Sequence, residues 1–175
     1  VTGGIGGLDV QGGERVVPLQ PSPPKFVDMA LAADQRRAVF LDLDGLVASL
    51  EVGAPLVVPL FFVEDTRTFA LASDGEHAVF GGAGFIEERS LADGALAFVH
   101  AVQGAVIALA VSPDGRFVAA GDRAGRTHLF ARRGGLVATF RDHTRRVSAV
   151  AFARDSSWLA SGSWDQTVRL RALDL

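Results

Sequence analysis

The stretch IALAVSPDGRFVAA, residues 107–120, decides the fold of this chain. Large and small apolar residues alternate from Ile107 to Val111, which is the period-two pattern of a β-strand. A Pro-Asp-Gly turn follows, and a second apolar strand begins at Phe117. Two more strands are predicted after glycine turns, at 127–131 and 136–140. The segment and its continuation therefore predict four short antiparallel strands joined by turns.

The same pattern occurs four times along the chain. The related segments are VDMALAADQRRAVF at 27–40, RTFALASDGEHAVF at 67–80 and SAVAFARDSSWLAS at 148–161. The turn aspartates recur at steps of 40, 40 and 41 residues and are Asp34, Asp74, Asp114 and Asp155. Unrelated hairpins in an ordinary all-β domain have no reason to keep so regular a spacing, so the spacing indicates an internal repeat.

A unit of four short strands that recurs about every 40 residues is typical of the blades of a β-propeller. Helical spacing is absent, and glycines interrupt each window long enough for a helix. We therefore predict an all-β fold of four-stranded antiparallel blades, about three of them whole, with a partial blade at each end. The predicted division is a partial blade at 1–19, a proline-rich connector at 20–26, blades at 27–63, 64–101 and 102–140, and an incomplete final blade at 141–175.

Both predicted end units lack a strand. Residues 141–175 supply three strands, and residues 1–19 resemble the last three strands of a blade. An open array of blades exposes strand edges and sheet faces. Two arrangements are compatible with this pattern. The sequence favours a segment of a larger ring over an arrangement in which the two end units meet and close a five-bladed ring.

Motifs in the last two units carry a family resemblance. The final unit contains Asp142-His143, VSAVAF at 147–152, Asp155 and LASGSWDQTVRL at 159–170, and the preceding unit contains VSPDGRFVAAGDRAGRTHLF at 111–130. These segments resemble WD40 repeats, and the resemblance is weaker but in phase across residues 27–100. It implies a propeller fold and a role as a non-catalytic scaffold for protein–protein interactions.

WD40 repeats often contain a buried hydrogen-bond relay of His, Ser or Thr, Asp and Trp. The resemblance assigns His143, Ser161 and Asp165 to this relay, whereas Arg171 occupies the tryptophan position. The preceding unit has alanine at both the Ser and the Asp positions. We therefore expect apolar packing, rather than the relay, to hold most of the blades, because a partly satisfied buried network costs stability.

The composition argues against two classes of partner. The chain has 175 residues, of which 49% are hydrophobic, and a formal net charge of −3. A general binder of nucleic acid or of anionic membranes would carry a basic excess, so we expect neither as a partner. The longest apolar run, residues 53–63, has about half the length that spans a bilayer and contains two prolines. Cysteine is absent, which excludes disulfides and thiolate metal sites.

One motif offers an enzymatic alternative. AVFLDLDGL, residues 38–46, resembles the first motif of haloacid-dehalogenase-type phosphatases, in which Asp42 would attack phosphorus and Asp44 would act as acid and base beside Mg²⁺. Leu46 replaces the expected threonine, the sole lysine precedes the motif, and the crossover helices of a parallel sheet are not predicted. The repeat register gives Asp42 a simpler interpretation as a loop residue after a second strand, equivalent to Gly82, Asp122 and Ser163.

No other grouping predicts catalysis, a cofactor or a metal. The four histidines are scattered over different repeats without metal-ligand spacing and are His77, His100, His128 and His143. The arginines at 132–133 and 141–146 are interpreted as solvated loop surface rather than a nucleic-acid site. We therefore predict a protein that is not an enzyme and has no cofactor.

In WD40 propellers, the loops before each first strand and after each second strand lie on one rim. The resemblance places Arg123, Arg145, Arg146 and Trp164 on this rim in the last two units, and acidic residues at the start of the repeat array: Asp42, Asp44, Glu64 and Asp65. Exposed Trp and Arg often anchor protein interfaces, so the basic group is predicted to bind a partner. The alternative for Trp164 is that it covers a neighbouring blade.

The expected partner is another protein, or the rest of the same propeller or parent chain. We further expect a scaffold or sensor region of a larger cytoplasmic protein, and a regulatory domain packed against an ATPase module of its own chain is compatible with the same residues.

Overall fold

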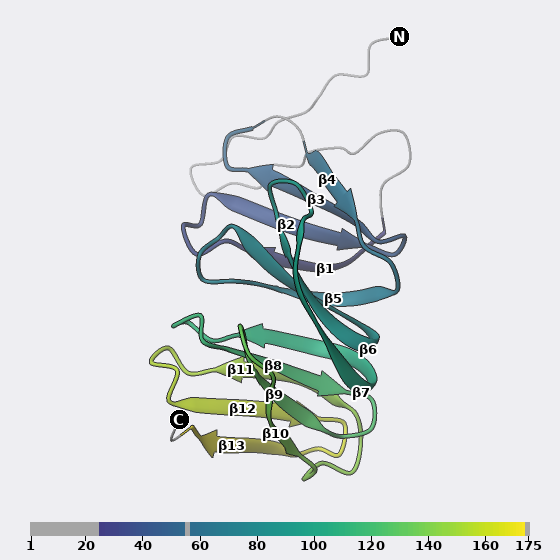
Figure 1. The fold of residues 1–175 in the computed structure, drawn as a ribbon, viewed down its shortest axis with the longest axis vertical. Coiled ribbons are helices and arrows are strands. Elements are labelled where there is room, and N and C mark those ends of the chain that lie inside the picture. The colour runs from purple at the N-terminus through teal and green to yellow at the C-terminus, as the bar shows by residue number, and fades with distance from the viewer. Residues whose placement is uncertain (1–24, 55–56, 174–175) are drawn as a thin grey trace.

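A computed structural model describes residues 25–54 and 57–173, and every regular element in these residues is a β-strand (Figure 1). The predicted partial blade at 1–19 and most of the connector at 20–26 lie outside the described residues. The strands are β1 (Phe26–Leu31), β2 (Arg37–Asp42), β3 (Leu46–Glu51), β4 (Val58–Phe62), β5 (Thr66–Leu71), β6 (His77–Ser90), β7 (Leu96–Val111), β8 (Phe117–Asp122), β9 (Thr127–Ala131), β10 (Leu136–Phe140), β11 (Val147–Phe152), β12 (Trp158–Ser163) and β13 (Val168–Ala172).

All the strand pairs are antiparallel and follow chain order. Strands β1–β4 form one sheet, β5–β10 form a second, and β11–β13 form a third. The first strand of each repeat has a register shift at an equivalent place, at Phe26/Asp28, Thr66/Thr68, Val106/Ala108 and Val147/Ala149. The repeat found in the sequence is therefore also a repeat of local backbone geometry.

The six-stranded sheet contains two repeats because β6 and β7 each serve as two strands. The two ends of β6 meet, since the Leu91 N–H donates to the carbonyl of Glu76 at 2.8 Å. A straight strand of this length would be roughly 45 Å long, so β6 folds back, and Gly84 has a φ of +97° at the reversal. Its first half pairs with β5 and its second half with the start of β7. The end of β7 pairs with β8.

Turn chemistry explains why the first two strands of each repeat form a hairpin. The four turn aspartates each accept the N–H of the residue two positions later, at distances of 2.9 to 3.1 Å. The residue after each aspartate has positive φ and is glycine in two repeats, Gly75 and Gly115. This local bonding needs no other part of the chain, so the hairpins can be recognised in the sequence.

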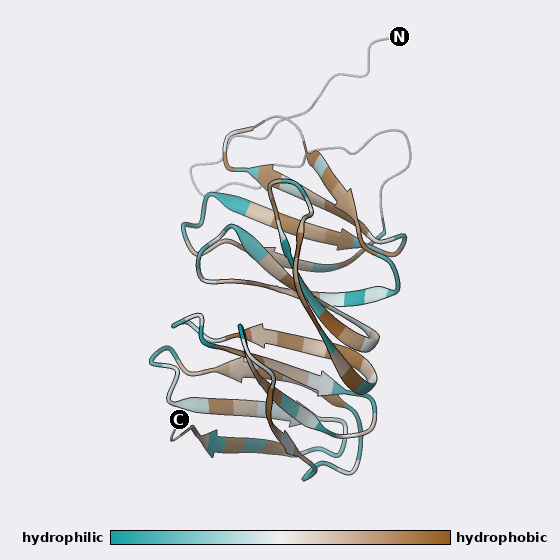
Figure 2. Ribbon diagram, viewed as in Figure 1, coloured by the Kyte–Doolittle hydropathy of each residue, from teal (hydrophilic) through white to brown (hydrophobic). Residues whose placement is uncertain are grey.

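Successive four-stranded units, including the two halves of the six-stranded sheet, pack face to face through three apolar clusters. Figure 2 shows hydrophobic residues along the strands and hydrophilic residues concentrated in the connecting loops. The first cluster joins β1–β4 to β5 and β6 and includes Leu41 and Phe80, the second includes Val79 and Val118, and the third includes Leu129 and Leu159. Stacked antiparallel sheets of this kind are propeller blades. The all-β propeller fold predicted from the sequence is confirmed.

The described part of the chain contains no apolar helix of the length needed to span a bilayer.

Candidate functional site

Three loops meet at one edge of the last two repeats and carry the four residues predicted to bind a partner. Arg123 lies in the β8–β9 turn, Arg145 and Arg146 lie in the loop before β11, and Trp164 lies in the β12–β13 turn. The Trp164 N–H donates to the carbonyl of Arg146 at 3.1 Å. The Ser163 hydroxyl donates to the carbonyl of Arg145 at 2.9 Å. These bonds hold the second and third loops together.

Gly125 brings the β8–β9 turn against the loop before β11. Its φ of +85° lies in the left-handed region, and a Cβ atom there would clash with the carbonyl of His143. Arg123 lies in the same turn as Gly125. Its N–H donates to the carbonyl of Ala105 at 3.1 Å, and its side chain is exposed. The structure thus brings the three arginines and Trp164 onto neighbouring loops of one rim.

Trp164 is the largest exposed side chain of this rim. It is 56% exposed, and the Arg146 guanidinium lies 3.1 Å from the centre of its ring. A cation held over an aromatic face stabilises both side chains and limits their rotamers. The pair therefore forms a pre-ordered surface feature that combines an apolar plate with positive charge.

A buried hydrogen-bond relay lies beneath the rim. Nδ1 of His143 lies 3.0 Å from an Asp165 oxygen, and Nε2 lies 2.9 Å from the Ser161 hydroxyl. Because a carboxylate only accepts, Nδ1 must carry the proton, and Nε2 then accepts from Ser161. The Thr167 hydroxyl donates to Asp165 at 2.6 Å and, with the N–H groups of Thr144 and Thr167 and with His143, holds the pKa of Asp165 well below its ordinary value. The relay fixes the β12–β13 turn that carries Trp164.

The family model of the WD domain, G-beta repeat, matches residues 96–130 and 134–171. This chain contains WD40 repeats. The resemblance predicted from the sequence is confirmed for both segments, which include all of β7–β9 except Ala131 and nearly all of β10–β13. No match to the chain is found among curated proteins.

The matched WD40 repeats are out of step with the sheets by one strand. Residues 96–105 pair with β6, whereas the strands in the remainder of the first matched repeat pair within β7–β9. In the same way, the second match begins near β10, which pairs with β9, and ends in β13. Each sequence repeat therefore begins in one blade and ends in the next, which joins adjacent blades through the chain itself.

Arg171, at the tryptophan position of the last WD40 repeat, makes contacts outside the relay. Its guanidinium pairs with Asp142 and lies 4.1 Å from the ring centre of Phe140 on β10. These contacts connect β13 to the outer strand of the preceding blade. Arg171 thus replaces the indole donor of a relay within one repeat with a contact between two repeats.

The preceding WD40 repeat has a buried polar network that the sequence analysis missed. Asp122 is completely buried and bonds to Nε of Arg126 at 2.6 Å, and it lies 3.2 Å from Nε2 of His128. Nδ1 of His128 lies 3.1 Å from the Thr139 hydroxyl. Burial alone would raise the pKa of Asp122, but bonds from the Arg126 backbone and guanidinium and from His128 outweigh it and lower the pKa. This repeat is therefore not held by apolar packing alone.

Asp42 closes a turn, which accounts for the phosphatase-like motif. One of its oxygens accepts the N–H groups of Asp44 at 2.9 Å and Leu46 at 2.8 Å. Asp122 binds the equivalent N–H groups of its own turn, both at 2.8 Å. A phosphatase of the haloacid-dehalogenase type needs a parallel sheet with helical crossovers, whereas the described strands pair antiparallel throughout residues 25–54 and 57–173. Asp42 is thus a turn residue of the repeat.

The interpretation of Arg132 as solvated loop surface is wrong. It is only 7% exposed, and its guanidinium bonds to both oxygens of Glu88, at 2.7 and 2.8 Å, and to Asp74 at 2.7 Å. Burial would raise the pKa of Asp74, but the Arg132 bond and the N–H groups of Glu76 and His77 lower it to about 2. The triad is an ionic connection between two repeats that lie next to each other.

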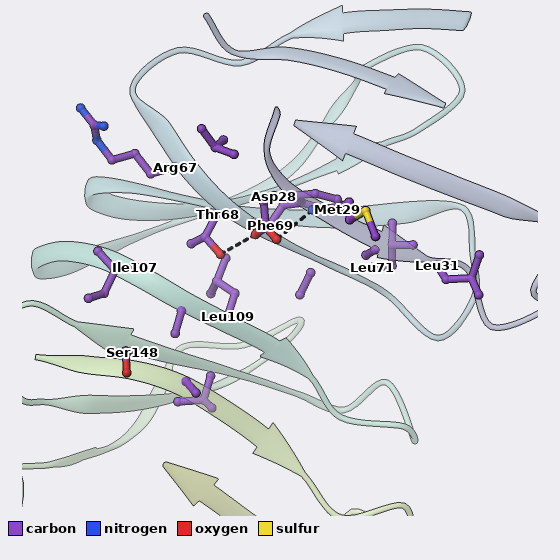
Figure 3. Close-up of a pocket in the computed structure, with 16 residues that line it drawn as sticks. Asp28, Met29, Leu31, Arg67, Thr68, Phe69, Leu71, Ile107, Leu109 and Ser148 are labelled. Atoms are coloured by element: carbon purple, nitrogen blue, oxygen red, sulfur yellow. Dashed lines mark hydrogen bonds between the residues drawn. The ribbon is translucent and has the colours of Figure 1, made fainter. Parts of the chain in front are cut away.

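The first strands of the repeats line an inner groove of about 550 Å³ (Figure 3). Within it, the Thr68 hydroxyl donates to Asp28 at 2.9 Å, and the Phe69 N–H donates to the same carboxylate at 3.1 Å. A second cavity of about 590 Å³ lies near the start of the repeats and includes Asp44, Glu64 and Asp65 in its lining. The described rim is therefore acidic there and basic around Trp164.

In residues 25–54 and 57–173, no three His, Asp or Glu side chains are grouped as they would be around a metal ion.

Proposed function

We propose that this chain binds an acidic segment of a partner protein on the rim formed by Trp164, Arg146, Arg145 and Arg123. WD40 repeats serve in general as non-catalytic scaffolds for protein–protein interaction, and their specificity depends on rim side chains rather than on the fold. The observation that carries the proposal is the half-exposed Trp164 with Arg146 over its ring, fixed to a buried relay.

The charge around Trp164 favours an acidic partner. Arg123 and Arg145 are exposed on adjacent loops, and the Arg146 guanidinium stacks on the indole. Opposite charges steer association and fix the orientation of two partners, and a tryptophan at the centre supplies most of the apolar contact. The relay reduces the entropy cost of binding, because the loop is ordered before the partner arrives.

The wider assignment is also a proposal. We infer that 27–63, 64–101 and 102–140 are whole blades and that 141–175 is an incomplete one, in a scaffold or sensor region of a larger cytoplasmic protein. The regular strand pattern and the WD40 matches support this division. The rest of the propeller or of the parent chain is then a second partner.

A selection from a random peptide display library tests the rim. We expect enriched peptides to be acidic, and their affinity to fall by about tenfold or more for Trp164→Ala, as for an interface anchor. Arg146→Ala should weaken binding less. Val52→Ala is the matched control, because Val52 is an exposed apolar side chain in the β3–β4 loop. Binding to this control should equal that of the wild type.

The thermal midpoint separates binding from packing. Because Trp164 is 56% exposed, its replacement should leave the midpoint nearly unchanged. A large fall in the midpoint with unaltered peptide binding would assign Trp164 to blade packing. Enriched peptides without acidic residues, or with affinity independent of Trp164, would contradict the proposed rim.

A further inference from the structure

The unit formed by β5, β6 and the first half of β7 has a fourth strand with one unpaired edge. Residues 96–105 pair with β6, and no strand of the described residues pairs with their other side. The carbonyls of Gln103 and Ala105 accept donors from the β8–β9 turn, so the free part is 96–101, which we call the outer edge. The first strands line the inner groove, so the fourth strands lie on the outside of the array (Figure 3).

The outer edge lacks the side chains that ordinarily protect a free strand. Residues 94–113 contain no Asp, Glu, Lys or Arg, and the outer edge contains no proline. Leu96 and Val99 are 52% and 51% exposed, although described units lie on both sides. Further blades of the propeller would adjoin β1–β4 or β11–β13, so they would leave this edge open. An exposed apolar edge without charge or proline is a template for pairing with another strand.

The fourth strands of the two neighbouring units are protected in the usual ways. Strand β4 contains Pro59, which has no N–H to donate to a further strand. Exposed arginines, Arg133 and Arg141, flank β10. Charge and proline are the devices that keep strand edges from pairing. The contrast distinguishes the outer edge from the other two described strands that hold the same position in their units.

From this contrast we propose that two copies of the chain form a dimer by antiparallel pairing of their outer edges. Every second residue of an edge strand points its N–H and C=O outward, where a second copy can bind them. A two-fold axis perpendicular to the sheet places one residue opposite its own copy, and Val99 lies near the middle of the free edge. Phe98 then lies opposite His100 of the second copy, and Ala97 lies opposite Ala101.

A second copy suits this edge because the edge is complementary to itself. No charged side chain meets a like charge across the axis, and aromatic and β-branched residues form the cross-strand pairs. The rings of Phe98 and His100 lie 4.7 Å apart, and His100 stacks on Phe130 of the next unit at 5.3 Å. This packing orders the strand before a second copy arrives, which lowers the entropy cost of binding. So short an edge buries less surface than a standard interface, so the dimer should be weak and reversible.

Analytical ultracentrifugation over a wide concentration range tests the proposal. We expect a reversible equilibrium between monomer and dimer for the wild type. Val99→Lys should weaken the dimer by about tenfold or more, because the axis places the two lysines directly opposite each other. Val137→Lys is the matched control, since Val137 is 43% exposed on β10, and it should leave the dimer unchanged. A monomeric wild type would leave the edge to a strand of another protein and would overturn the proposal, as would a dimer that Val99→Lys does not weaken.

Mixing two charge variants provides a second test that loss of folding cannot imitate. Val99→Lys and Val99→Glu chains should each be mainly monomeric. Their mixture should form a one-to-one heterodimer, because opposite charges then meet at the axis. A mixture that stays monomeric would contradict the position of Val99 opposite its own copy.

The absence of cysteine allows a direct check of the register. Residues directly opposite each other on antiparallel strands have Cα atoms within the range that a disulfide spans. Val99→Cys chains should therefore cross-link on mild oxidation, whereas Val137→Cys chains should not. If neither the heterodimer nor the cross-link forms, the edge-to-edge dimer is wrong, whatever the result for peptides at the rim.

Discussion

The repeats at 96–130 and 134–171 have the same strands but different buried polar groups. The later repeat has His143, Ser161 and Asp165 in a relay. The earlier one instead pairs Asp122 with Arg126 and His128. Both sets close the turn between the second and third strands and connect it to a neighbouring segment. The comparison teaches that the blade requires satisfied polar groups at this turn, while their identity can change.

The largest expected effect comes from Asp122→Ala. It would leave the Arg126 guanidinium and His128 without their carboxylate in a buried site, so we expect a loss of about 3–5 kcal/mol in the free energy of unfolding. Urea denaturation monitored by circular dichroism measures this loss. A loss of this size would show that the network of Asp122, Arg126 and His128, which takes the place of the relay in this repeat, is necessary for stability.

Asp42→Ala is the matched control for that experiment. Asp42 binds the equivalent two N–H groups of its own turn, but no arginine or histidine side chain of the described residues bonds to it. We expect a loss of only about 1–2 kcal/mol, for the hydrogen bonds to the turn. Equal losses for the two variants would mean that Asp122 stabilises the protein only through its turn and that Arg126 and His128 add nothing to the free energy of unfolding.

Acid sensitivity tests the ionic connection between Arg132, which directly follows the earlier repeat, and Asp74 in the unit before it. The pKa of Asp74 is lowered from 3.8 to about 2 in the folded protein, so the unfolded chain binds the proton more readily. The stabilisation from ionised Asp74 is therefore complete above pH 3.8 and is lost as the pH falls towards about 2. Asp74→Asn should be less stable than the wild type at neutral pH, and this difference should shrink across that interval. A difference in denaturation midpoint that stays constant with pH would contradict the role of the Arg132–Asp74 pair.

Local rules account for most of the fold. Strands β9 and β10 have the bounds predicted from the sequence, Thr127–Ala131 and Leu136–Phe140. Alternation and turn residues determine these elements within a few positions, so the sequence alone was sufficient. The grouping of the rim residues followed from the family topology rather than from local rules.

The polar contacts between repeats could not be predicted from local patterns. Arg132 bonds to Glu88 and Asp74, which are 44 and 58 positions away, and its burial depends on the sheet that covers it. An arginine close to a Gly-Gly turn is typical of a solvated loop, and the burial of Arg132 follows only from the position of the sheet that covers it. Asp122 had a detectable signal, namely an acidic residue at the turn with Arg126 at the end of the turn and His128 on the following strand.

The smallest expected effects concern the turn residue that differs between the two repeats, Gly115 and Ser156. Both have positive φ, +71° and +61°, which costs energy for any residue with a Cβ atom. Gly115→Ala should therefore destabilise the protein by about 1 kcal/mol. Ser156→Gly relieves the same strain but removes a hydroxyl that accepts the Asp114 N–H at 3.2 Å, so the two effects oppose each other. We expect a net change within about 0.5 kcal/mol by thermal unfolding. A clear gain in stability for Ser156→Gly would show that strain outweighs the bond between repeats, and a clear loss would show the reverse.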